Sequence, residues 1–129
     1  MSRILTGGCH CGALRFKATT SANDVIICNC SICRKKGARH LRVSPDEFEL
    51  LQGGDGIVLY QFGTRVAKHP FCQNCGIHPF NFPRSAPDMI NINIQCLDNL
   101  EELEAGFNYI QFDGQHWEQA VADLRKALD

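Results

Sequence analysis

Eight cysteines in a chain of 129 residues constrain the fold more than any other feature of this sequence. Seven of them lie in closely spaced sets: Cys9 and Cys11; Cys28, Cys30 and Cys33; and Cys72 and Cys75, with Cys96 alone. The N-terminal segment lacks the long apolar run and cleavage site of a secretory signal, so we expect a cytoplasmic protein. In a reducing cytosol, clustered cysteines bind metal or carry out redox chemistry more often than they form structural disulfides.

Length and charge narrow the range of partners. A chain of this length fits one domain, which we place over residues 1–129. The formal net charge is −1, and no acidic tail or basic tract stands out. We therefore expect neither nucleic acid nor an anionic membrane surface as a partner. No segment approaches the roughly eighteen consecutive apolar residues of a membrane span.

The first and last cysteine pairs are spaced for one metal site. In an extended segment, Cys9 and Cys11 share a face with Cα atoms about 6.6–6.8 Å apart, which is the outer limit for a disulfide. Two thiolates on one zinc lie roughly 3.8 Å apart, because each Zn–S bond is about 2.3 Å. Cys72 and Cys75 form a C-x2-C turn, and Gly76 can take the positive φ that such a turn needs. We expect these four cysteines to form a closed structural zinc site.

Cys28, Cys30 and Cys33 can close on a second metal from one short segment. Three thiolates leave one tetrahedral position for water or substrate, the arrangement that distinguishes catalytic from structural zinc. Two alternatives stay open. Cys96 or a histidine can fill the fourth position, or Cys30 and Cys33 can act as a redox pair. Cys96 is otherwise expected to be a buried apolar residue.

Short alternating or β-branched runs between glycine, proline and polar residues predict a mainly β fold. In the first run, Leu14 and Phe16 share one face, and Arg15 and Lys17 share the other. Strands are predicted within residues 12–19, 24–28, 40–43, 48–52, 56–62, 65–71, 77–82 and 89–96.

One tight turn and two helices complete this prediction. Gly63 and Thr64 suit a two-residue hairpin turn with glycine first. Ser31 can cap a short helix after the middle cysteines, and Gly37 can end it. The tail, residues 116–129, is expected to be a helix with one apolar face formed by Trp117, Val121, Leu124 and Leu128.

The cysteine motifs resemble those of the glutathione-dependent formaldehyde-activating enzyme family. The resemblance covers nearly the whole chain and rests on "GGCHCGALRF", "CNCSIC" and "HPFCQNCG", with "INIQCLD" and "FDGQHWE" also similar to small bacterial members. It implies a β-tent fold with two zinc ions per chain. The family's structural zinc ligands match Cys9, Cys11, Cys72 and Cys75, and its catalytic zinc ligands match Cys28, Cys30 and Cys33.

The activity that this resemblance implies is that of a carbon–sulfur lyase, which adds glutathione to formaldehyde to give S-hydroxymethylglutathione. We expect thiol activation, because a metal with an open position deprotonates a bound thiol and the thiolate is the nucleophile. Arg34 and Lys35, followed by Lys36, can neutralise the thiolate-rich site and hold a substrate carboxylate. For the two lysines, a solvated basic helix face is the alternative. His78 is the expected proton-transfer residue.

A second hypothesis of a different class also fits these residues. The protein can be a non-catalytic, zinc-stabilised module that binds a partner protein or a small thiol. The open metal position favours the enzyme, whereas the absence of an identifiable general base favours the module. A third possibility is redox sensing through Cys28, Cys30 and Cys33.

Overall fold

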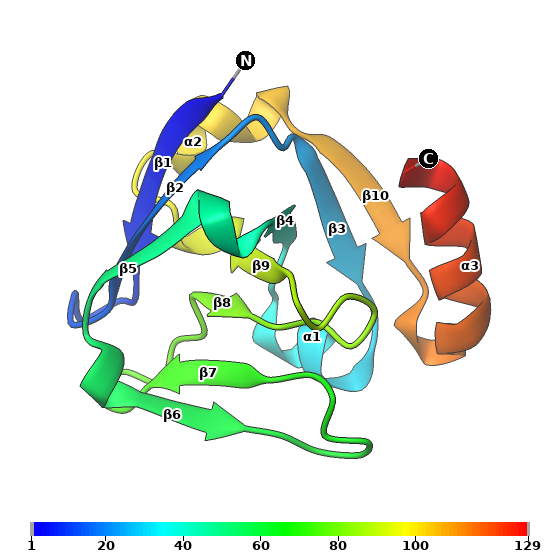
Figure 1. Cartoon of the computed structure of the whole chain (residues 1–129), viewed down its shortest axis with the longest axis horizontal. Helices are drawn as coiled ribbons and strands as arrows, with labels where there is room; N and C mark the ends of the chain where they lie inside the picture. The colour runs from blue at the N-terminus through cyan, green and yellow to red at the C-terminus, as the bar shows by residue number, and fades with distance from the viewer. Residues whose placement is uncertain (1, 129) are drawn as a thin grey trace.

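Three β-sheets of different size make up most of the fold (Figure 1). The computed structural model describes residues 2–128 and the side chains of residues 2–126. One sheet has three strands in the order β1 (Arg3–Gly8), β2 (Arg15–Thr20) and β5 (Phe48–Gln52). The second has five, in the order β10 (Asn108–Phe112), β3 (Asp24–Cys28), β4 (His40–Val43), β9 (Ile90–Asn93) and β8 (Phe80–Asn81). The third pairs β6 (Ile57–Tyr60) with β7 (His69–Cys72).

The main core lies between the three-stranded and the five-stranded sheets. Phe16 of β2, Leu41 of β4 and Ile92 of β9 are all fully buried in it. Successive strand residues point to opposite faces, so the apolar members of β4 and β9 face this core. Leu14 is buried as well, while Arg15 and Lys17 are partly exposed, as the alternation predicted.

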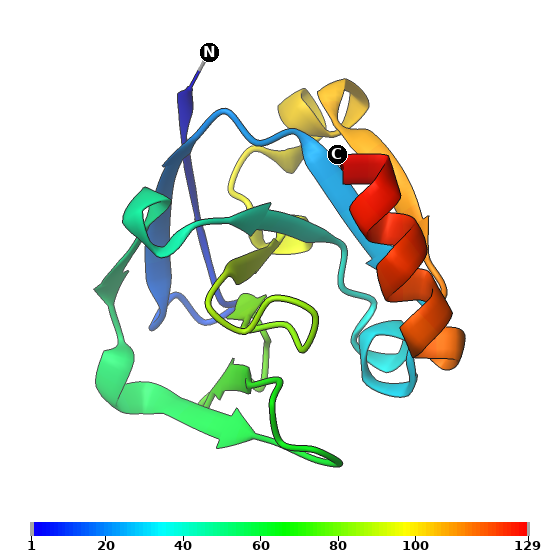
Figure 2. The ribbon, with the colours of Figure 1, turned by 45° about the vertical axis from the view of Figure 1, so that its right-hand side comes forward.

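The other face of the five-stranded sheet is divided between an apolar and a polar part. Helix α3 (Trp117–Leu128) covers the β3–β10 end through Ala120, Val121 and Leu124, which pack against Ile26 and Phe112. Figure 2 shows this helix beside β10, on the side away from the three-stranded sheet. Trp117 contributes to the same cluster, whereas the side chain of Leu128, the fourth predicted position, lies outside those described.

The mainly β fold, the short helix after the middle cysteines and the C-terminal helix are confirmed. Helix α1 spans Ser31–Lys36 and ends at Gly37, which has a φ of 67°. A second short helix, α2 (Leu100–Leu103), and the 3-10 turns Pro45–Glu47, Gly54–Gly56, Ile94–Cys96, Glu104–Gly106 and Gly114–His116 complete the secondary structure. Within residues 2–128, no helix combines the length and the apolar character that a membrane crossing needs.

Three details of the predicted strands are wrong. Strands β6 and β7 do pair in antiparallel fashion, but Tyr60 lies opposite His69, so residues 61–68 form a long loop instead of a tight turn at Gly63 and Thr64. The strand predicted to end at Cys96 ends at Asn93, because the Asn93 side chain accepts a hydrogen bond from the Gln95 amide and starts a 3-10 turn. Strands β1 and β10 were not predicted.

Candidate metal and active site

The four outer cysteines converge at one point. The ligand atoms of Cys9, Cys11, Cys72 and Cys75 all lie within 4.8 Å of one another. Cys11 Sγ lies 3.6 Å from both Cys9 Sγ and Cys72 Sγ, close to the roughly 3.8 Å expected for thiolates that share a tetrahedral zinc. All eight cysteines are free thiols. The donor set fits a metal ion with four sulfur ligands.

Backbone hydrogen bonds and a glycine turn hold the cysteines of this four-cysteine site in place. Cys9 follows β1 directly, and its sulfur accepts a hydrogen bond from the Leu14 amide at 3.2 Å. Cys72 closes β7, and Gly76, with a φ of 76°, turns the chain so that its amide donates to the Cys72 carbonyl at 2.8 Å. A residue with a Cβ would be strained at that φ. The positive φ expected at Gly76 is therefore confirmed.

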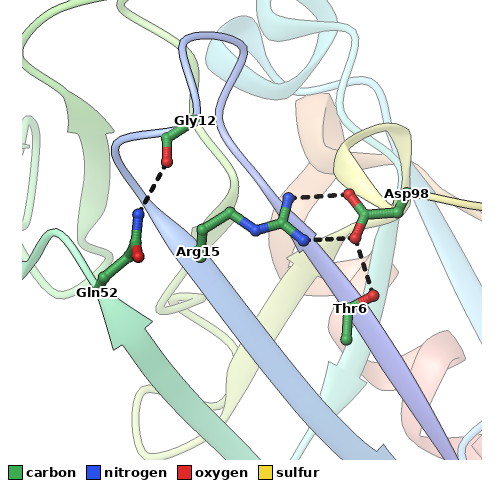
Figure 3. A network of polar contacts seen from close by, with 5 residues as sticks. All are labelled: Thr6, Gly12, Arg15, Gln52 and Asp98. Carbon is green, nitrogen blue, oxygen red and sulfur yellow. Dashed lines mark hydrogen bonds and ion pairs between the residues drawn. The ribbon is translucent and has the colours of Figure 1, made fainter.

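Polar contacts brace the turn that carries Cys11 (Figure 3). Gln52 Nε2 donates to the Gly12 carbonyl at 3.1 Å. Arg15 makes a two-pronged ion pair with Asp98, which also accepts a hydrogen bond from Thr6 Oγ1 at 2.8 Å. The Arg15 guanidinium lowers the pKa of the Asp98 carboxyl below its ordinary value. These contacts tie the four-cysteine site to strands β1, β2 and β5.

The three middle cysteines meet at the junction of β3 and α1. The ligand atoms of Cys28, Cys30 and Cys33 all lie within 4.8 Å of one another. Cys30 Sγ caps α1 by accepting from the Cys33 amide at 3.5 Å, and Cys28 Sγ accepts from the Cys30 amide at 3.4 Å. The prediction that Ser31 caps this helix is wrong, because the sulfur of the preceding residue takes that role.

The pKa values of the three middle cysteines (the trio) indicate that a cation is needed to deprotonate all of them. The neighbouring Cys28 thiol, together with Cys33, lowers the pKa of Cys30. In turn, Cys30 raises the pKa of Cys28 to about 11, and the two together raise that of Cys33. Three thiols this close therefore favour a single thiolate on their own. Deprotonating all three requires a positive charge among them, which a metal ion supplies.

A glycine next to the trio leaves room for its sulfurs. A Cβ built on Gly114 would lie 2.6 Å from Cys30 Cβ and 2.7 Å from Cys28 Sγ. The loop that carries Gly114 is fixed to the trio by Asn29, whose Nδ2 donates to Asp113 at 3.0 Å and whose Oδ1 accepts from the Gln115 amide at 3.2 Å. Residues 113–115 thus form one wall of the three-cysteine site.

His40 is the histidine nearest to the trio. Its Nε2 lies 3.3 Å from Cys33 Sγ, and its side chain is buried. Burial, and to a smaller extent the positive charge of Lys36, lowers the pKa of His40 to about 3, so the ring is neutral near pH 7. Among the described residues, His40 is not one of those whose ligand atoms share the 4.8 Å cluster. In this structure His40 therefore forms a hydrogen bond to the Cys33 sulfur and does not join the three-cysteine cluster.

Two adjoining cavities lie beside the cysteine sites. The smaller, of about 540 Å³, is lined by all three middle cysteines. The larger, of about 880 Å³, is lined by Cys9 but by none of the trio. Ser31, Ile32 and Phe62 line both. We place the chemistry in the smaller cavity, because that is where three metal-binding sulfurs are accessible to a ligand.

Comparison with known proteins agrees with this geometry. A model of the glutathione-dependent formaldehyde-activating enzyme family matches residues 4–111, a range that contains both cysteine sites. The chain belongs to this family. A relative from Halomonas elongata that bears the family's name is 29% identical over 105 residues, which are 74% of this chain and 67% of the relative. The resemblance seen in the motifs is thereby confirmed.

A solved structure shares the fold. The crystal structure of a Rhodobacter sphaeroides protein matches with a TM-score of 0.72 at 34% sequence identity. The match covers 81% of this chain and 97% of that one. Nearly the whole of that protein therefore superposes on the formaldehyde-activating enzyme fold described above.

The predicted substrate-binding and catalytic residues of this family member lie in different places. Lys35 and His78 line the larger cavity, and Arg34 is exposed on α1 and lines neither cavity. Burial lowers the pKa of His78 to about 4. Cys96 also lines the larger cavity, outside both metal-binding clusters, and burial raises the pKa of its thiol to about 11.

Sequence reasoning gave no special role to His69, which the structure places on the wall of the cavity that contains the trio. Buried His69 lines the smaller cavity, and its Nδ1 lies 3.3 Å from Lys36 Nζ. An ammonium only donates, so Nδ1 accepts and the ring proton is on Nε2, which has no hydrogen-bond partner among the described residues. Burial and Lys36 lower the pKa of His69 to about 4. Only the position of His69 beside the "PFC" motif could have drawn attention to it.

Proposed function

We propose that this protein binds two zinc ions and uses the second to add the thiol of glutathione to formaldehyde, giving S-hydroxymethylglutathione. In this proposal, Cys9, Cys11, Cys72 and Cys75 hold a structural zinc, and Cys28, Cys30 and Cys33 hold a catalytic one. The observation that carries it is the convergence of three sulfurs on the wall of the smaller cavity, with no fourth ligand in their cluster among the described residues. The family's name supports the choice of thiol and aldehyde.

The reaction joins the thiol sulfur to the aldehyde carbon. As the S–C bond forms, the C=O double bond becomes a single bond, and the thiol proton ends on the former carbonyl oxygen. Zinc held by the trio would supply thiol activation, because a bound thiol loses its proton near neutral pH. The backbone amides that donate to Cys28 and Cys30 favour the anionic form of these two sulfurs, in addition to the effect of the metal.

His69 is our candidate for assisting the oxygen. Its Nε2–H has no partner within the part of the chain that the structure describes, and its side chain lines the cavity that contains the trio. A hydrogen bond from this group stabilises an oxyanion that develops from the aldehyde. Lys36, through its contact with Nδ1, fixes the tautomer that makes this donation possible. His78 stays a prediction for proton transfer from the larger cavity.

Lys35 supports substrate approach in this proposal. It lies on α1, two residues beyond Cys33, and lines the larger cavity, which adjoins the smaller one. Its positive charge favours the approach of an anionic thiol. Eight free thiols also suit the reducing cytoplasm in which we place the protein.

The test is an exchange measurement on the zinc-loaded protein. Exchange NMR between S-hydroxymethylglutathione and free formaldehyde is expected to be faster than in buffer. In Cys30→Ser, we expect the rate to return to that of buffer and the zinc content to fall from two to one per chain. Cys96→Ser, which alters a cysteine outside both clusters, is expected to retain two zinc ions.

An exchange rate equal to that of buffer in the wild-type protein, with two zinc ions bound, would contradict the enzyme and favour the alternative of a non-catalytic zinc-stabilised binding module. A Cys30→Ser variant that keeps full activity would exclude the trio as the catalytic centre, whatever the metal content.

A further inference from the structure

A row of polar side chains crosses the five-stranded sheet beside the three cysteines. Arg42 of β4 lies opposite Asn91 of β9, and Asn91 lies opposite Asn81 of β8. Residues directly opposite in a sheet point to the same face. Their neighbours Leu41 and Ile92 point into the main core, so the polar row faces the other way, towards the smaller cavity, which all three of its members line.

Asn81 and Asn91 of this row are buried and Arg42 is partly buried, and their hydrogen bonds are incompletely satisfied. Asn81 is only 3% exposed, and none of the described groups forms a hydrogen bond with its Oδ1. Arg42 Nε donates to Asn91 Oδ1 at 3.2 Å, and Arg42 also donates to Ser85 Oγ at 2.9 Å. Both of its partners are neutral. Buried polar groups are normally paired, so an unpaired one that lines a cavity points to a ligand.

Arg42 also lacks a counter-ion. Among the described side chains, no aspartate or glutamate forms an ion pair with it, and none of those lining the smaller cavity is acidic. Burial lowers the pKa of Arg42, which shows that its charge is costly there. The other arginine on this cavity, Arg84, stacks on Trp117 at 3.7 Å. A partly buried guanidinium without an anion loses hydration that nothing in the protein replaces, and an anionic ligand would offset that loss.

We propose that Arg42, supported by Asn91 and Asn81, binds a carboxylate of the thiol substrate and thereby directs its sulfur to the three-cysteine site. The proposal rests on the proposed function and names the residues that recognise the non-reacting end of the substrate. A planar guanidinium matches a carboxylate with two parallel hydrogen bonds. The unpaired Asn81 Oδ1 suits a donor next to that carboxylate, such as the ammonium of an α-amino acid.

The test uses S-methylglutathione, which keeps both carboxylates but has no thiol to react. Its binding to the zinc-loaded protein is measured by calorimetry, so the result does not depend on catalysis. Arg42→Gln removes the cation. Asn91→Asp keeps the size and the hydrogen bond to Arg42 Nε but places an anion on the guanidinium, and it serves if Arg42→Gln does not fold. Arg34→Gln is the comparison variant: the sequence predicted that Arg34 holds the substrate carboxylate, whereas in the structure this arginine is exposed and lines neither cavity.

We expect Arg42→Gln and Asn91→Asp each to weaken binding by roughly tenfold to a hundredfold, the range for a hydrogen-bonded charge. Arg34→Gln is expected to bind as the wild type does, and all variants are expected to retain two zinc ions. Wild-type affinity in Asn91→Asp, an equal loss in Arg34→Gln, or no binding to the wild type at millimolar probe would overturn the proposal. Binding that depends on Arg42 in a protein without exchange activity would instead contradict only the proposed function.

Discussion

The two cysteine sites differ in how far apart in the sequence their sulfurs lie. Cys11 and Cys72, in contact in the four-cysteine site, are 61 positions apart, whereas Cys28 and Cys33 belong to one short segment. A metal in the first site would join the end of β1 to the end of β7. A metal in the second would join only the end of β3 to the helix that follows it. The first site is therefore suited to stabilising the fold and the second to chemistry.

The surroundings of the two sites also favour a structural role for the first and chemistry at the second. All three sulfurs of the second site line one cavity, together with histidine and arginine side chains. Of the four cysteines in the first site, only Cys9 lines either of the two cavities described above, and a fourth sulfur occupies the position that a substrate would need. Burial alone does not distinguish the two sites, because Cys11 of the first site is itself exposed at the surface. The two sites differ in the number of sulfurs and in whether a ligand can take a coordination position.

Cys72→Ser is expected to have the largest effect, because it removes a buried ligand from the site that joins distant strands. Loss of a structural metal removes free energy of folding directly. We expect a loss of about 3 kcal/mol or more in the free energy of unfolding, measured by urea denaturation followed by circular dichroism. A variant that unfolds at the wild-type urea concentration would contradict the structural role of the four-cysteine site.

Cys30→Ser is expected to separate the two sites, because its effect falls on function. The serine hydroxyl can still cap α1, so the loss in the free energy of unfolding should be about 1 kcal/mol. Thermal unfolding monitored beside that of Cys72→Ser measures this difference. If the two variants unfold alike, the trio is as structural as the outer four, and the comparison between the sites fails.

Gly114→Ala is expected to impair the three-cysteine site alone. The added methyl group would lie 2.6 Å from Cys30 Cβ, so the sulfurs must shift. We expect the zinc affinity of this site to fall roughly tenfold, as for other changes next to metal ligands, while the four-cysteine site keeps its metal. Competition with a chromophoric chelator gives both affinities.

Gly106→Ala is the matched control for that variant, because nothing lies within 4 Å of a Cβ at Gly106. It should bind zinc at both sites as the wild type does. Equal zinc affinities in the two alanine variants would show that Gly114 does not shape the three-cysteine site.

Asp98→Asn is expected to have the smallest effect, because the Arg15–Asp98 ion pair near the four-cysteine site is partly exposed (Figure 3). Such pairs contribute about 0.5 kcal/mol. The pKa of Asp98 is lowered below 3.8 in the folded protein, so this contribution is present above pH 3.8 and is lost as the pH falls through the lowered pKa. Urea denaturation at pH 7 in low and high salt measures it. An unchanged difference between wild type and variant in 1 M salt would contradict an ionic origin, because salt screens exposed pairs.

The metal ligands could be predicted from the sequence because their geometry is set locally. The spacing of Cys9 and Cys11, or of Cys72 and Cys75, fixes the distance between neighbouring sulfurs whatever the rest of the chain does. The alternation of apolar and polar residues around Leu14 and Phe16 was also sufficient to predict that strand, because one face of the strand packs into the core.

The cavity side of the site could not be predicted in this way. "HLRV" and "ININ", the sequences of β4 and β9, alternate polar and apolar residues as a half-exposed strand does, but all four residues of β9 are buried. Burial of this polar face follows from β4, β8 and β9 lying side by side, which the spacing within one strand does not reveal. Gly114 approaches Cys30 across 84 positions of sequence, and the unpredicted strand β10 leads into the loop that carries it.

Anomalous diffraction at the zinc edge, from crystals of the zinc-loaded protein grown with glutathione, tests the central distinction most directly. Two zinc peaks per chain are predicted, one bound by Cys9, Cys11, Cys72 and Cys75 and the other by Cys28, Cys30 and Cys33 with a fourth ligand from outside the chain. A single zinc peak, or a protein side chain such as His40 in the fourth position of the second zinc, would contradict the account.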